Sequence, residues 1–76
     1  MYYLLIKLEN CPASMFTSTS GNALFICDPD DATRYMSSNA AKNDFYDYWR
    51  NSKGLGKIEA AYIYDDQMNM VSPLTV

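Results

Sequence analysis

Three aspartates close together, at positions 28, 30 and 31, are the first group in the chain that could bind a metal ion. Hard divalent cations prefer several carboxylate oxygens at short range. The run lacks the glycine and the distant bidentate glutamate of a calcium-binding loop. Instead, Asp28 directly precedes Pro29, which is typical of a helix start, where carboxylates also face the positive end of the helix dipole. We interpret Asp28, Asp30 and Asp31 as helix-capping residues and predict no metal site and no cofactor.

A second acidic pair, Asp65 and Asp66, has the residue type of catalytic carboxylates. If they met Asp28 across a sheet, they would supply the minimum for acid–base chemistry at a glycosidic bond or for metal-assisted hydrolysis. Neighbouring acids are ordinary in turns, however, and adjacent side chains on a strand point to opposite faces. The chain also has no histidine, which removes the commonest general base and the Ser-His-Asp and Cys-His arrangements. We predict no catalytic residue and no enzymatic activity.

Cys27 lies at the expected junction of a strand and a helix N-terminus, where the helix dipole can lower the pKa of a thiol. The aspartates that follow it disfavour a thiolate, and no histidine or nearby lysine assists it. Cys11 is the second cysteine, and the N-terminal segment shows no export signal. We therefore expect Cys11 and Cys27 to be reduced thiols and Cys27 to be inert, with a disulfide between the two as the alternative.

The segment 44–51 carries aromatic residues on both sides of an expected helix. Tyr46 and Arg50 lie four residues apart on one side, flanked by Asn43 and Asp47, and these residue types are enriched at binding hot spots. We predict that Asn43, Tyr46, Asp47 and Arg50 bind a partner; the alternative is that they only cover the helix surface. The other side is predicted to face the core: Phe45, Tyr48 and Trp49.

Several tyrosines on or beside expected strands have the placement of the sheet aromatics that stack on bases in small RNA-binding domains. Phosphate contacts require clustered cations, whereas this chain has six Lys plus Arg against nine Asp plus Glu and a formal net charge of −3. The same charge opposes anchoring to anionic lipid. We expect a protein partner, with no direct nucleic-acid and no membrane contact. The tyrosines with this placement are Tyr3, Tyr35, Tyr62 and Tyr64.

Length and composition place these residues in one small domain, residues 1–76, with 49% apolar and 20% charged residues, near the averages of soluble chains. Residues 1–9 lack the basic region and cleavage pattern of a signal peptide, and no stretch approaches the roughly 18 apolar residues of a membrane span. We expect a cytoplasmic protein.

Alternating apolar residues predict most of the strands. Residues 2–9 alternate, with Tyr2, Leu4, Ile6 and Leu8 expected in the core. Runs at 15–19 and 23–27 around Ser20-Gly21-Asn22 predict a hairpin with Leu24 and Ile26 on one face. Residues 57–65 are apolar on both faces, which predicts an inner strand, and 68–71 predict a short edge strand ending before Pro73.

The middle of the chain is expected to be helical from Pro29. Ala32, Tyr35 and Met36 form one apolar cluster, and the cluster around Phe45 lies half a turn away, so one straight helix cannot bury both. We predict a break at residues 37–39, a cap at Asn39 or Asn43, and a helix end at residues 53–54. The order of elements predicts an α+β domain: a mainly antiparallel sheet of three to five strands with one broken helix or two short helices on one face.

Small size, acidity and the lack of a catalytic set favour a non-catalytic protein-binding module that inhibits or modulates a larger protein or nucleoprotein complex. In these characters the chain resembles small phage-encoded inhibitors of host defence, including anti-CRISPR proteins, a resemblance that assigns no role to any residue. One alternative is a self-associating structural protein, a homodimer that buries Met68, Met70, Val71 and the odd-numbered face of residues 2–9. A further alternative is a small metal-dependent enzyme that uses the aspartates.

Overall fold

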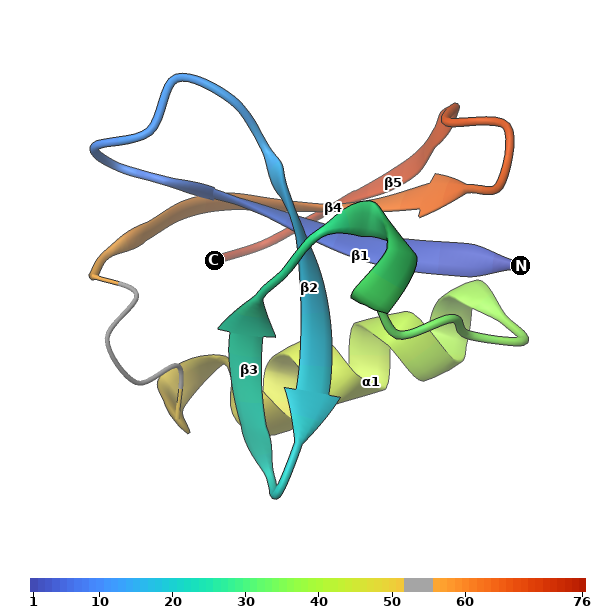
Figure 1. The fold of residues 1–76 in the computed structure, drawn as a ribbon, viewed down its shortest axis with the longest axis horizontal. Coiled ribbons are helices and arrows are strands. Elements are labelled where there is room, and N and C mark those ends of the chain that lie inside the picture. The colour runs from blue at the N-terminus through green and yellow to red at the C-terminus, as the bar shows by residue number, and fades with distance from the viewer. Residues whose placement is uncertain (52–55) are drawn as a thin grey trace.

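The computed structural model describes residues 1–51 and 56–76 of the chain. Five strands form one antiparallel sheet in the order β3-β2-β1-β4-β5, and helix α1 packs along one side of it (Figure 1). The predicted α+β fold is confirmed. The elements are β1 (Tyr2–Leu8), β2 (Met15–Ser20), β3 (Ala23–Ile26), the 3-10 turn η1 (Pro29–Asp31), α1 (Ser38–Tyr48), the 3-10 turn η2 (Trp49–Asn51), β4 (Ile58–Asp65) and β5 (Met70–Leu74).

The central strand β1 turns its even-numbered residues toward the core, as the alternation predicts, although Tyr2 is only partly buried. Leu4 and Ile6 are fully buried, and Leu8 is 8% exposed, in a cluster that includes Ala41 and Phe45 of α1. Burying a Leu, Ile or Phe side chain contributes about 1.5–3 kcal/mol each. The face of the sheet that carries these residues is therefore the one that α1 covers.

Strands β2 and β3 form the predicted hairpin and run at a steep angle to β1, β4 and β5 (Figure 1). Gly21 and Asn22 have positive φ of 58° and 63°, the left-handed backbone that a two-residue hairpin turn requires. β2 pairs with β1 only near Phe16 and Met15 before it diverges. The buried Thr17 hydroxyl bridges the divergence by donating a hydrogen bond of 2.8 Å to the Leu4 carbonyl.

The predicted helix over residues 29–36 is wrong. Only the single turn η1 forms: the Asp28 side chain makes no capping hydrogen bond, and the backbone is already extended at Ala32, with φ −64° and ψ 141°. The chain instead runs beside β1, where Tyr2 and Tyr35 exchange two backbone hydrogen bonds of 2.9 Å. Ala32 and Tyr35 are buried as predicted, whereas Met36 is 82% exposed, against the prediction, because no helical turn rotates it inward.

Helix α1 begins where the break was predicted, but with a different cap. The Ser37 hydroxyl, not Asn39 or Asn43, accepts a hydrogen bond of 3.1 Å from the Ala40 amide. Asn39 and Asn43 lie inside the helix, where they cannot be N-caps. α1 ends at Tyr48 and continues as η2, and the helix end predicted at residues 53–54 lies outside the described residues.

A polar network joins α1 to the hairpin and to the segment beside β1. The Tyr35 hydroxyl donates to the Asp44 carboxylate over 2.9 Å, and the Thr19 hydroxyl donates to the same oxygen over 3.3 Å. The Thr19 amide in turn donates to the Thr33 hydroxyl over 3.0 Å. Burial and the neighbouring carboxylate raise the pKa of Tyr35 above its usual value near 10. The network therefore holds Tyr35 as a neutral donor.

Strand β4 is an inner strand, as predicted, with β1 on one side and β5 on the other. An irregularity beside Glu59 shifts its register, so that Ile58 points inward together with Ala61 and Ile63. The edge strand β5 differs from the prediction because it begins at Met70 and runs through Pro73. Proline is tolerated at a sheet edge, where one side of the backbone needs no ladder partner.

Candidate binding surfaces

The aspartates do not assemble into a site. Among residues 1–51 and 56–76, no three His, Cys, Asp or Glu side chains lie close enough together to hold a metal ion. Asp28, Asp30 and Asp31 are exposed on or beside η1. In the same part of the chain, no helix is long and apolar enough to cross a membrane.

Cys11 and Cys27 are both free thiols. Burial raises the pKa of Cys27; a hydrogen bond with Ser18 opposes this shift, and the charges of Asp31 and Asp28 add to it. The helix dipole on which activation would depend is missing, because η1 is a single 3-10 turn. Cys27 therefore stays protonated at neutral pH and is a poor nucleophile.

Asn43, Tyr46, Asp47 and Arg50 form an exposed row along α1 and η2, which we call the α1 ridge. Two of them already make contacts within the protein. The Tyr46 hydroxyl accepts a hydrogen bond of 3.1 Å from the Thr75 amide, and its ring packs against the Phe45 ring in a T-shaped contact with 5.2 Å between centroids. The Arg50 guanidinium lies 5.3 Å from the centre of the Trp49 ring. Tyr46 thus links Thr75, which follows β5, to helix α1.

A second surface lies on the side of the sheet opposite α1. Directly opposite residues of antiparallel strands share a face, and β1 pairs Tyr3 with Tyr64 and Leu5 with both Phe16 and Tyr62. β5 extends this surface, since Met70 lies opposite Tyr64 and Pro73 opposite Tyr62. We call it the open aromatic face: Tyr3, Leu5, Phe16, Tyr62, Tyr64, Met70 and Pro73.

The low exposure of Leu5 indicates that the aromatic rings of this face pack around it. Leu5 is only 4% exposed although it points away from α1 and lies outside the cluster beneath the helix. Around it, Tyr3 meets Phe16 edge to face at 5.6 Å between centroids, and Tyr62 meets Tyr64 in the same way at 6.4 Å. These four rings are half-buried. They shield one leucine from water and leave their own outer surfaces accessible.

Carboxylates stand at both ends of the tyrosine row on β4. Near its start, Glu59 forms an ion pair of 3.0 Å with Lys7, the cation that follows Tyr3 and Leu5 on the same side of β1. Beyond its end, the Asp66 carboxylate lies 3.3 Å from the α-ammonium of Met1. Each of these cations is therefore already matched by a carboxylate.

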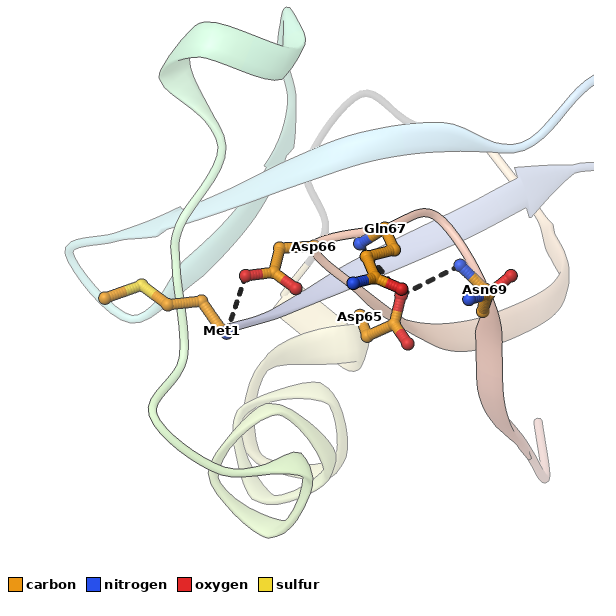
Figure 2. A network of polar contacts seen from close by, with 5 residues as sticks. All are labelled: Met1, Asp65, Asp66, Gln67 and Asn69. Carbon is orange, nitrogen blue, oxygen red and sulfur yellow. Dashed lines mark hydrogen bonds and ion pairs between the residues drawn. The ribbon is translucent and has the colours of Figure 1, made fainter.

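Figure 2 shows how the turn after β4 is held. Asp65 Oδ1 accepts hydrogen bonds from the amides of Gln67, at 3.0 Å, and Asn69, at 2.9 Å. The neighbouring Asp66 faces Met1 instead. Asp65 thus has a structural role in the turn, which leaves Asp66 as the carboxylate exposed at this end of the row.

The chain was compared with protein-family models, curated proteins and solved structures. No family model, curated protein or solved structure matches the chain. Any proposal about its function therefore rests on its own sequence and structure.

Helical spacing predicts that the residues of the α1 ridge share one side of the helix, whereas no sequence pattern predicts the open aromatic face as one surface. Its members come from four strands, and only the strand pairing brings them together. The apolar character of both faces of residues 57–65 predicts an inner strand, and the odd-numbered face of residues 2–9 is predicted only as a self-association surface. Tyr3, Tyr62 and Tyr64 have the placement of sheet aromatics, but the charge of the chain argues against their stacking on bases.

Proposed function

We propose that the protein is a non-catalytic binding protein that occupies the surface of a larger, basic protein partner through the open aromatic face. The observation that carries the proposal is the cluster of four half-buried rings around Leu5 on the side of the sheet opposite α1. Accessible apolar surface of this kind marks interaction sites, and tyrosine is enriched at interface hot spots.

Charge supports a basic partner. The chain carries a formal net charge of −3, and Lys7 beside the open aromatic face is matched by Glu59. An acidic protein is steered toward positive surfaces, and tyrosine rings attract lysine and arginine through cation–π contacts. Proteins and complexes that bind nucleic acids offer such surfaces. A small protein that covers one of them acts as an inhibitor or modulator by excluding the natural ligand.

The α1 ridge is the competing contact surface, and a matched pair of substitutions separates the two. Tyr64→Lys places a cation on the open aromatic face, where it repels a basic partner, and Tyr46→Lys makes the same change on the ridge. The partner is captured from host extract at low salt with tagged protein, purified, and titrated with each variant. Unchanged circular dichroism and thermal unfolding establish that both variants are folded.

Loss of binding by Tyr64→Lys alone, to a partner whose binding weakens at high salt, is the expected result. Loss of binding by Tyr46→Lys alone would assign partner binding to the α1 ridge instead. If both variants bind as tightly as the wild type, neither surface is the binding site.

Self-association is the second candidate, favoured by the exposure of Met70 and Val71 on the edge strand β5, at 53% and 47%. An exposed apolar edge strand is a template for pairing with another chain. Light scattering distinguishes the two candidates. If the wild type is a dimer and Tyr64→Lys dissociates it, the open aromatic face binds a second copy of the chain. If the wild type is a monomer, self-association is excluded.

A further inference from the structure

We infer that the ligand of the open aromatic face is an extended apolar segment bracketed by two basic residues and laid along β4. This inference rests on the proposed function and adds the chemistry of the bound segment. It follows from the order of side chains along β4 and its turn, where Tyr62 and Tyr64 lie between Glu59 and Asp66.

Both bracketing carboxylates are accessible. The side chain of Glu59 is 52% exposed and that of Asp66 is 60% exposed. Their present partners, Lys7 and the Met1 ammonium, form surface ion pairs, which hold weakly in water. A guanidinium donates two parallel hydrogen bonds to a carboxylate and is less strongly hydrated than an ammonium. Arginines of a ligand can therefore replace these partners.

The spacing sets the length of the segment. Seven residue steps separate Glu59 from Asp66, which corresponds to roughly 23 Å in fully extended chain. A ligand that bridges the two carboxylates needs about six extended residues between its cations. Alternate side chains of that segment would lie on the rings of Tyr62, Tyr64 and Tyr3, beside Met70, whose flexible thioether adapts to different shapes.

Two synthetic peptides test this arrangement. Both have the same centre of alternating leucine and threonine, one with arginine at each end and one with glutamate. Each is titrated into the isotope-labelled full chain and followed by amide chemical shifts. We expect the arginine peptide to bind at least about tenfold more tightly, a difference typical of complementary against like charges at an interface, and to shift amides of β4 and β5.

The double variant Glu59→Gln, Asp66→Asn should weaken binding of the arginine peptide by about fivefold and flatten its salt dependence. Asp30→Asn is the matched control, because it removes one exposed carboxylate that belongs to η1 and not to β4 or its turn, and should leave the affinity unchanged.

Equal affinity for the two peptides, no binding of either, or shifts confined to α1 would overturn the inference. The proposed function is judged separately by Tyr64→Lys and the captured partner. If Tyr64→Lys abolishes partner binding while the two peptides behave alike, the open aromatic face remains the docking site and only the bracketed-segment chemistry fails.

Discussion

Truncating Leu5 to alanine measures whether the open aromatic face is an apolar cluster in its own right. The change removes about three carbons, or ~2.4 kcal/mol at about 0.8 kcal/mol for each buried methylene. The surrounding rings are half-buried and can move into the space, so the additional cavity cost is small. We expect Leu5→Ala to lower the free energy of unfolding by about 2–3 kcal/mol.

Two matched substitutions calibrate this value. Leu4 is the neighbouring residue on the same strand, 0% exposed on the side that α1 covers, and Leu4→Ala should cost about 3–5 kcal/mol because its cavity cannot collapse. Met70 is 53% exposed on the same face as Leu5, and Met70→Ala should change the free energy of unfolding by less than about 0.5 kcal/mol.

The assay is urea unfolding at equilibrium, followed by far-ultraviolet circular dichroism. A chain of 76 residues is expected to have a free energy of unfolding of about 4–11 kcal/mol, so the expected losses give clear decreases in the transition midpoint. If Leu5→Ala costs no more than Met70→Ala, water already reaches the leucine. The four rings then do not pack as a cluster that shields Leu5.

Three further outcomes are expected from the polar contacts. Ser37→Ala removes the α1 cap and should destabilise the protein by about 1 kcal/mol in thermal unfolding, whereas Ser37→Asp should restore most of it. The pKa of Tyr35 is raised in the folded state, so at high pH the tyrosine of the unfolded chain ionises first. The contribution of Tyr35 to the free energy of unfolding is therefore complete below about pH 10 and declines at higher pH. The unfolding free energy of Tyr35→Phe should therefore depend less on pH above 10 than that of the wild type, and parallel curves would contradict this. Tyr46→Phe removes the acceptor for the Thr75 amide, so amide exchange at Thr75 should accelerate while exchange at Phe45 stays unchanged.

The strands of the sheet could be predicted where the local pattern of apolar residues matches the side chains that are buried. In β1 the alternation of Leu4, Ile6 and Leu8 has the period of a strand, and the turn at Gly21–Asn22 requires a backbone that these residues adopt readily. The position of the α1 ridge was predictable for the same reason, because helical spacing alone separates Tyr46 from Phe45.

The features that the sequence did not predict depend on contacts between residues distant in the sequence. Asp28-Pro29 suits a helix start and a single turn equally well, and the extended alternative is stabilised by backbone hydrogen bonds between Tyr35 and Tyr2, 33 residues away. The contact of Tyr46 with Thr75 has no local signal either. The open aromatic face depends on the register of β1 with two strands, which the composition of a single strand does not specify.

The position of β1 in the sheet has a consequence for the order of folding. β1, β2 and β3 follow one another in the chain and can pair early, but the other edge of β1 must wait for β4, which brings Leu4 beside Ile63. Closing such a long loop is entropically costly, so this step is expected to set the folding rate. Until it happens, the backbone groups on that edge of Tyr2–Leu8 have no strand beside them. During synthesis β1 is thus the first strand made but gains its second neighbour only late, and the interval before β4 docks is when the chain is most exposed to intermolecular strand pairing.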